Sequence, residues 1–256
     1  MLLVIDIGNT DIVMGLFQDE KLAGQWRIAT RLHQTPDEYG LLLRQLLLEE
    51  AWSVAQIDGV ILSSVVPPLT SLFQEMISRY FPVEPLVVTE KLKTGLRLCI
   101  DNPKEIGADR IVNAAAAYHL YGGPLVIVDL GTATTFCVVS ESGDYLGGAI
   151  APGMALSAEA LVSRAAKLPR IELSNPGKVI GTDTVSSMQS GLFFGYVGLI
   201  HEIVHRMHAV LGGTTPVIAT GGLSSLIAPE CPVISKIHPT LTLEGLMIIY
   251  KMNTSG

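Results

Sequence analysis

Two short segments decide the fold: Val4-Ile5-Asp6-Ile7-Gly8 and Ile127-Val128-Asp129-Leu130-Gly131. Each is an apolar strand that ends in Asp, one apolar residue and Gly, and each is followed by small polar residues and a second apolar strand. The two copies are separated by close to half of the 256-residue chain. A unit repeated once at that spacing predicts two duplicated domains, because a solenoid would repeat about every 20–50 residues.

Strand-like and helix-like patterns alternate around these two segments, which predicts an α/β fold with a mixed sheet and helices in each domain. Thr35 is expected to cap a helix that begins with Pro36 at its first turn. A Gly-rich link is expected over residues 147–153, a polar loop over 169–183, and a long helix from about 186 to 211. No linker of low complexity separates the halves, so we place the domains at residues 1–118 and 119–256.

Composition limits the possible partners and compartments. The chain is 48% hydrophobic with a formal net charge of −7. Its basic residues are scattered, whereas a nucleic-acid surface needs them clustered, so no nucleic acid is expected. The N-terminus lacks the basic region of a signal peptide, and no apolar run reaches the roughly 18 residues of a membrane span. We therefore expect a cytoplasmic protein without a membrane partner.

A strand that ends in Asp before a Gly-containing turn is one way to hold polyphosphate. Backbone N–H groups of the turn face the phosphates, and the carboxylate can hold a hydrated Mg²⁺. The alternative is that Gly8 and Gly131 only permit a hairpin and that each Asp caps its turn. The chain contains neither GxxxxGK[ST] nor GxGxxG, which argues against a Walker-type P-loop and a dinucleotide dehydrogenase.

The two hairpins, together with Thr220-Gly221-Gly222, resemble the phosphate and adenosine motifs of the actin, hexokinase and heat-shock-70 ATPase superfamily, whose core is ribonuclease H-like. The ordered set of motifs is more specific and resembles type III pantothenate kinases over essentially the whole chain. The matching segments are Asp6-Ile7-Gly8-Asn9-Thr10, Gly107-Ala108-Asp109-Arg110, Asp129-Leu130-Gly131-Thr132, residues 148–153, and residues 181–184 leading into 187–191.

The resemblance implies ATP-dependent phosphorylation of pantothenate to 4′-phosphopantothenate, the first step of coenzyme A biosynthesis. It implies a homodimer with the substrate pocket at the subunit interface, and ATP in a cleft between the domains. Asp109 would accept the proton, Asp6 would hold Mg²⁺, and Asp129 would hold a monovalent cation, K⁺ or NH₄⁺. The implied ATP contacts are Asp6, Ile7, Gly8, Asn9, Thr10, Asp11, Ile12, Val13 and Thr132. The implied pantothenate contacts are Gly107, Ala108, Asp109, Arg110 and Thr184.

One position departs from the family pattern. Family members often carry Tyr before the Asp-Asn-Pro that precedes the Gly107 segment, and here that residue is Ile100. An apolar contact with the substrate can survive, whereas a phenolic hydrogen bond cannot, so Ile100 is a weaker substrate contact.

Two other functions are compatible with parts of the sequence. An actin-like nucleotide-binding or regulatory protein would keep the hairpins without turnover, but it would not need the acceptor site that Asp109 and Arg110 indicate. His201-Glu202-Ile203-Val204-His205 matches the HExxH pattern of zinc peptidases, but the metzincin extension is absent because Leu211 stands where its third His would be. We therefore expect His201, His205 and His208 to lie on one face of a helix, at the surface or at an interface.

Overall fold

The computed structural model describes residues 1–254, and the chain divides into two compact units. Unit 1 contains residues 1–96, 101–119 and 241–254, and unit 2 contains residues 97–100 and 120–240. The C-terminal helix therefore belongs to the same unit as the N-terminal sheet. A division of the chain into two continuous segments at residue 118 does not describe this arrangement. The position of the domain boundary stays a prediction.

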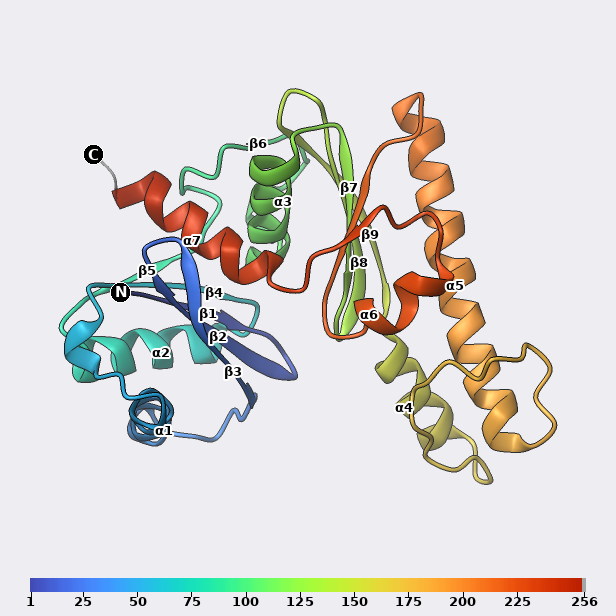
Figure 1. Ribbon diagram of the computed structural model, residues 1–256, viewed down its shortest axis with the longest axis horizontal. Helices are drawn as coiled ribbons and strands as arrows, with labels where there is room; N and C mark the ends of the chain where they lie inside the picture. The colour runs from blue at the N-terminus through green and yellow to red at the C-terminus, as the bar shows by residue number, and fades with distance from the viewer. Residues whose placement is uncertain (255–256) are drawn as a thin grey trace. The chain divides into compact units, whose positions relative to one another are not determined.

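Unit 1 is built on a five-stranded mixed sheet of order β3-β2-β1-β4-β5 (Figure 1). Its strands are β1 (Leu2–Ile7), β2 (Asp11–Gln18), β3 (Lys21–Ala29), β4 (Gly59–Ser64) and β5 (Pro85–Val87). Its helices are α1 (Pro36–Glu49), α2 (Pro67–Tyr80), α3 (Ala108–Tyr121, the last two residues of which fall in unit 2) and α7 (Leu241–Thr254). Short 3₁₀ turns cover Val54–Gln56 and Pro103–Glu105.

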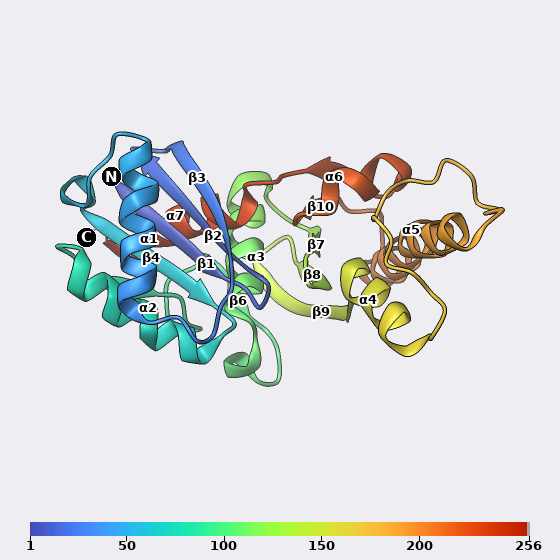
Figure 2. The same ribbon diagram turned by 90° about the horizontal axis from the view of Figure 1, so that it is seen from below.

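The alternation of side chains along β1 gives this sheet two buried faces. Leu3, Ile5 and Ile7 pack in one core with apolar residues of α1 and α2. Leu2 and Val4 pack in a second core with α3 and α7. Figure 2 looks onto the first of these faces, with α1 and α2 in front of the strands. The near-continuous apolar sequence of β1 follows from this burial on both sides.

The start of α1 confirms the predicted cap. The Thr35 side chain accepts a hydrogen bond from the Glu38 N–H, the Glu38 carboxylate accepts one from the Thr35 N–H, and Pro36 occupies the first turn. This reciprocal pair satisfies two of the donors that a helix N-terminus leaves free. The helix therefore begins where the sequence indicates.

Unit 2 is built on a six-stranded sheet of order β11-β10-β7-β8-β9-β6. Its strands are β6 (Arg97–Leu98), β7 (Leu125–Leu130), β8 (Ala133–Val139), β9 (Asp144–Pro152), β10 (Val217–Thr220) and β11 (Lys236–Ile237). Its helices are α4 (Met154–Arg164), α5 (Thr184–Leu211) and α6 (Ser224–Ile227), followed by a 3₁₀ turn over Ala228–Glu230. Alternate residues of β7 pack in a core with α4, α5 and α6.

The prediction of a Gly-rich link over residues 147–153 is wrong, because most of these residues belong to strand β9. This strand pairs antiparallel with β8, and its register shifts beside Val138 and Val139. Gly147 has a φ of +104° next to this shift, a conformation that glycine adopts at little cost. The glycines therefore mark a β-bulge inside a strand.

The two units repeat one arrangement, as the paired segments predict. β1 and β7 have the same pattern of buried and partly buried positions, with the Asp in the same place. Each pairs antiparallel with the strand that follows it and parallel with a later strand, β4 or β10. Among residues 1–254, no helix is long and apolar enough to cross a membrane.

Candidate functional site

The β1–β2 hairpin carries the first predicted phosphate segment. The Gly8 N–H donates to the Asp11 carbonyl oxygen at 2.9 Å, and the Thr30 hydroxyl donates to the Gly8 carbonyl oxygen at 2.6 Å. Asn9 and Thr10 are exposed at the turn. The predicted residues that flank this turn form the last two residue pairs between β1 and β2, which are Asp6 with Val13 and Ile7 with Ile12.

Asp6 lies on the face of the sheet that α3 and α7 cover, because it alternates with Leu2 and Val4. Its carboxylate oxygen Oδ1 accepts a hydrogen bond from the hydroxyl of Ser63, a fully buried residue of β4. The carboxylate is thus held at the end of a rigid strand.

Asp109 lies in the first turn of α3. Its Oδ1 accepts a hydrogen bond from the Arg110 backbone N–H at 2.8 Å. Burial raises the pKa of Asp109 above its usual 3.8, against the opposing effects of this hydrogen bond and of the Arg110 charge. A carboxyl group with a raised pKa is a suitable proton acceptor, because a good catalytic base has a pKa closer to the working pH.

Gly107 leaves the space that the Asp109 carboxylate occupies. A Cβ at residue 107 would lie 2.4 Å from Asp109 Oδ1 and 3.4 Å from Val65 Cγ1. The Val65 N–H in turn donates to the Ile7 carbonyl oxygen at 3.1 Å. Within unit 1, Val65 therefore connects the Gly107–Arg110 segment to the carboxyl end of β1. The segment and the Asp6 hairpin thus lie at the same end of the sheet.

Asp129 lies at the end of β7, and Gly221 packs against it. Gly221 has a φ of +90°. A Cβ there would meet Asp129 Oδ1 at 2.5 Å and the Leu130 backbone at 2.6 Å. Sequence reasoning assigned Gly221 to an adenosine motif and missed this contact, because residues 129 and 221 meet only through the pairing of β7 with β10.

Gly221→Ala is expected to destabilise the protein by about 2–4 kcal/mol. Part of this loss of stability arises because the left-handed backbone conformation disfavours any residue with a Cβ. The rest arises because the added Cβ collides with the Leu130 backbone, which cannot move away as a side chain could. The melting temperature should fall by roughly 4–16 °C, at the 2–4 °C per kcal/mol typical of chains near this size.

Gly212→Ala is the matched control for this variant. Gly212 also has a positive φ, +76°, but nothing lies within 4 Å of its missing Cβ. Its replacement should cost only the backbone part, about 1–2 kcal/mol. Equal losses for the two variants, measured by thermal and urea unfolding, would contradict the steric role of Gly221.

The turn after β7 holds Thr132, the other predicted ATP contact. The Gly153 N–H donates to the Thr132 carbonyl oxygen at 3.0 Å, so the end of β9 packs directly on this turn. Ile100 follows β6 and lies beside β9, with its Cγ2 3.7 Å from the place of a Cβ on Gly147.

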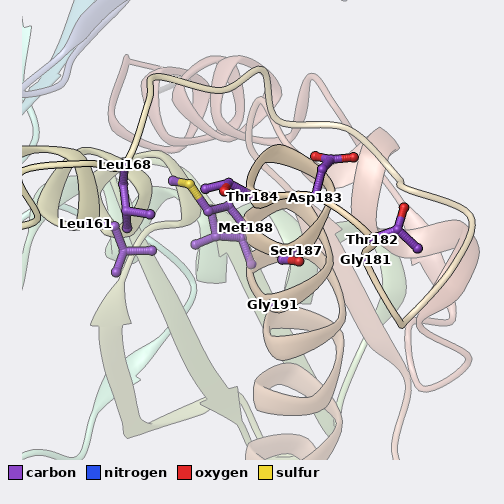
Figure 3. Close-up of a pocket in the computed structure, with 10 residues that line it drawn as sticks. Leu161, Leu168, Gly181, Thr182, Asp183, Thr184, Ser187, Met188 and Gly191 are labelled. Atoms are coloured by element: carbon purple, nitrogen blue, oxygen red, sulfur yellow. The ribbon is translucent and has the colours of Figure 1, made fainter.

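Thr184, a predicted pantothenate contact, is the first residue of α5 and lines a pocket of about 720 Å³ (Figure 3). The Asp183 carboxylate caps the helix by accepting the Ser186 N–H at 2.9 Å, and this hydrogen bond lowers the pKa of Asp183. Figure 3 shows Leu161 and Leu168 facing Met188 across the pocket. The lining is thus apolar on one side and polar at the start of α5, and it includes Leu161, Leu168, Gly181, Thr182, Asp183, Thr184, Ser187, Met188, Gly191 and Leu192.

The predicted site residues divide between the two units. Asp6–Val13 and Gly107–Arg110 belong to unit 1, and Ile100, Asp129, Thr132 and Thr184 belong to unit 2. Ser63 was missed by sequence reasoning, although two serines at the end of a buried apolar strand are a signal worth examination, because buried polar groups need partners.

The HExxH pattern lies on α5, with exposed His201 and His205 rings stacked 6.3 Å apart between centroids. Glu202 forms an ion pair with Arg206 at 2.6 Å. Among residues 1–254, no group of three His, Cys, Asp or Glu residues is arranged to hold a metal ion. The predicted surface location is confirmed for His201 and His205, whereas His208 is partly buried and its Nε2 lies 3.1 Å from the Thr215 carbonyl oxygen.

Comparison of the chain with solved structures identifies its fold. A structure described as a Baf family transcriptional activator from Campylobacter jejuni superimposes with a TM-score of 0.62 at 19% identity, covering 99% of this chain and all of the other. A ROK family glucokinase from Streptomyces griseus, in complex with glucose and AMPPNP, gives a TM-score of 0.53 at 11% identity and covers 100% and 99% of the two chains. These likenesses, to sugar kinases among others, confirm the predicted fold class.

Sequence comparison identifies the family. The family model described as type III pantothenate kinase matches residues 2–206. A protein named type III pantothenate kinase from Moorella thermoacetica is 52% identical over 254 residues, which cover 99% of this chain and 100% of that protein. Both findings agree with the motifs at Asp6, Asp109 and Asp129. The chain therefore belongs to the type III pantothenate kinase family.

Proposed function

We propose that this protein transfers the γ-phosphoryl group of ATP to the primary hydroxyl of pantothenate, giving 4′-phosphopantothenate and ADP at the entry to coenzyme A biosynthesis. The observation that carries the proposal is the Asp109–Arg110 pair at the start of α3, held beside the Asp6 hairpin through Val65. A protein that only binds nucleotide needs neither a proton acceptor such as Asp109 nor a positively charged side chain such as Arg110 to bind the carboxylate of a second substrate.

In the proposed reaction, the pantothenate hydroxyl oxygen forms a bond to the γ-phosphorus as the bond to the bridging oxygen breaks. Asp109 orients that hydroxyl and takes its proton, since phosphoryl transfer depends mostly on positioning and charge stabilisation. Arg110 pairs with the pantothenate carboxylate through two hydrogen bonds. Gly107, Ala108, Thr184 and, more weakly, Ile100 complete the proposed substrate contacts.

The Asp6 hairpin is the proposed ATP site, with contacts over residues 6–13 and at Thr132. An Asp carboxylate suits Mg²⁺, which prefers oxygen ligands and usually relies on one or two carboxylates together with substrate phosphates. Asp6 fits this pattern, since its carboxylate is fixed by Ser63 at the edge where the turn lies. Mg²⁺ bound with ATP supplies charge neutralisation of the phosphates.

Asp129 is the proposed ligand of a monovalent cation, K⁺ or NH₄⁺. Its carboxylate lies against Gly221, where a larger residue would fill the space beside it.

A homodimer is the proposed assembly, with the substrate pocket at its interface. Large apolar side chains are exposed near the pocket of unit 2, on α4, on the loop before α5 and on α5 itself. They are Leu156, Leu161, Val179, Ile180 and Val185, of which Ile180 is 79% exposed. A second subunit would remove this apolar surface from water.

A coupled assay of ADP release tests the function and the cation together. We expect ADP to be released only when pantothenate is present, and faster in K⁺ or NH₄⁺ than in Na⁺ or Tris, because Asp129 is assigned to a large monovalent cation. ADP release that does not depend on pantothenate would overturn the acceptor. Equal rates in all buffers would remove only the cation from the proposal.

A further inference from the structure

Tyr196 is a buried residue of α5 whose hydroxyl has two polar partners. Its side chain belongs to the core of unit 2 and is 7% exposed. The hydroxyl donates to the Pro152 carbonyl oxygen at 2.6 Å and lies 2.7 Å from the Ser157 hydroxyl. A phenol has one proton, and here it goes to Pro152, so Ser157 is the donor in the second contact. A phenylalanine would fill the same space, so the hydroxyl serves these contacts and not the packing.

The Pro152 carbonyl and the Gly153 N–H are the two ends of one peptide group, which is planar and rigid. Tyr196 holds the carbonyl end. The N–H end donates to the Thr132 carbonyl oxygen at 3.0 Å. A hydrogen bond to the carbonyl of a peptide also strengthens the bond that its N–H donates, because the two polarise one another. A side chain of α5 therefore sets the orientation of a peptide that supports the turn after β7.

The backbone at residue 153 packs closely on this turn. A Cβ on Gly153 would lie 2.3 Å from the Thr132 carbonyl oxygen and 2.5 Å from the Gly131 carbonyl oxygen. With no space between the two segments, a rotation of the Pro152–Gly153 peptide would displace the turn.

Unit 1 supports its equivalent turn in a different way. The end of β3 lies there as the end of β9 does in unit 2, since Ala29 pairs with Asp11. The Thr30 N–H donates to the Thr10 carbonyl oxygen at 2.9 Å, and the Thr30 hydroxyl donates to the Gly8 carbonyl oxygen at 2.6 Å. Glycine at the corresponding position of unit 2 has no side chain for that second contact. A hydrogen bond to the peptide itself takes its place, which accounts for the hydroxyl buried on α5.

We propose that Tyr196 is a positioning residue for the Gly131–Thr132 turn: its hydroxyl fixes the Pro152–Gly153 peptide, and this peptide holds the turn in the shape that binds the polyphosphate of the nucleotide. This inference rests on the proposed function, in which Thr132 contacts ATP. Tyr196 acts through the backbone of β9 and not by contact with a substrate.

The test is Tyr196→Phe, with the ATP analogue AMPPNP and Mg²⁺ as the probe. Calorimetric titration without pantothenate gives the AMPPNP dissociation constant, and steady-state kinetics give both KM values. Loss of one neutral hydrogen bond changes an equilibrium constant by roughly 2–10-fold. We therefore expect the AMPPNP dissociation constant and the KM for ATP to rise at least about 3-fold. The KM for pantothenate should stay within about 2-fold, because the hydroxyl has no part in the proposed acceptor contacts.

Amide hydrogen exchange, followed by mass spectrometry, measures the effect on the peptide itself. The segment that contains Gly153 should exchange faster in Tyr196→Phe, because the N–H opens more often once the carbonyl end is released. If this variant does not fold at the assay temperature, Ser157→Ala is measured in its place. It removes only the second partner of the hydroxyl, so a smaller change in the same direction is expected.

Tyr145→Phe is the matched control, since it removes the same atom from another buried tyrosine of unit 2. The Tyr145 hydroxyl donates to Cys137 Sγ at 3.3 Å. Tyr145 pairs with Val139, at the end of β8 that is far from the turn. This variant should leave AMPPNP affinity and the exchange of the Gly153 segment unchanged. Equal effects of the two tyrosine variants would assign the loss to general destabilisation and overturn the inference.

Gly153→Ala separates this inference from the assignment of the turn to ATP. Its Cβ collides with two carbonyl oxygens of the turn, so it should weaken AMPPNP binding whatever holds the peptide. Weak binding in Gly153→Ala with normal binding in Tyr196→Phe would overturn the positioning role and leave the proposed function intact. Normal binding in both would overturn the assignment of Thr132 to ATP as well. Only a lack of pantothenate-dependent ADP release in the unmodified enzyme would overturn the proposed function.

Discussion

Asp109→Asn is expected to lower kcat by at least about 10²-fold, since general-base catalysis typically contributes about 10²–10⁴-fold. The amide keeps the shape of the carboxylate, and its oxygen can still accept the Arg110 N–H, but it cannot take the proton of the acceptor hydroxyl. Nucleotide affinity and melting temperature should change little. Steady-state kinetics with both substrates varied, together with thermal unfolding, measure all three quantities.

The pH profile gives this prediction a second measurement. Asp109 must be ionised to accept a proton, and burial raises its pKa above the usual 3.8. In the unmodified enzyme, kcat/KM should therefore fall as the pH drops through this raised pKa, and that limb should vanish in Asp109→Asn. Glu105→Gln is the control, because it removes an exposed charge four residues away. If Asp109 were only a helix cap, Asn, an equally good cap, would leave turnover near the original value.

Gly107→Ala is expected to lower kcat by about 10²-fold, the loss that a displacement of roughly 1 Å can cause in a reacting group. The added Cβ would lie 2.4 Å from Asp109 Oδ1. The nearest atom is the end of a side chain, so the carboxylate can rotate away and lose its hydrogen bond from Arg110. The variant should therefore fold normally and fail in catalysis, in contrast to Gly221→Ala.

Gly213→Ala is the control for the glycine replacement itself, since nothing lies within 4 Å of its missing Cβ and it is exposed. Its turnover should match the unmodified enzyme. A crystal structure of Gly107→Ala should show the Asp109 side chain in a different rotamer. If the turnover of Gly107→Ala stays within about 3-fold of the unmodified enzyme, the position of the Asp109 carboxylate is not critical for catalysis. That result would contradict the large loss expected from a misplaced reacting group.

The sequence was informative where local chemistry decides the structure. The Asp-x-Gly hairpins and the capping of α1 by Thr35 follow from neighbouring residues, and the structure confirms both elements. The long helix α5 begins two residues before the expected residue 186, because Asp183 supplies the cap. β9 was missed because its pairing with β8 allows two glycines in a strand.

Contacts between distant residues were not predictable in the same way. Ser63 and Asp6 are 57 positions apart, and their contact depends on the parallel register of β1 and β4. Gly221 meets Asp129 through another parallel pair. Neither of these two contacts produces a pattern among neighbouring residues of the sequence. The sequence therefore identified both carboxylates but not the residues that pack against them. The roles of Asp6, Asp109 and Asp129 in the reaction stay predictions.

The place of α7 in unit 1 has a consequence for synthesis on the ribosome. Domains usually fold in the order in which they are made, at about 5–20 residues per second. Here the sheet of β1 to β5 emerges first, but Leu243, Leu246 and Ile249 of α7 complete one of its cores. Residues 120–240 must leave the ribosome before that helix does. The part of this apolar face that α7 covers therefore stays uncovered while residues 120–240 are made, and the unit made first is finished last.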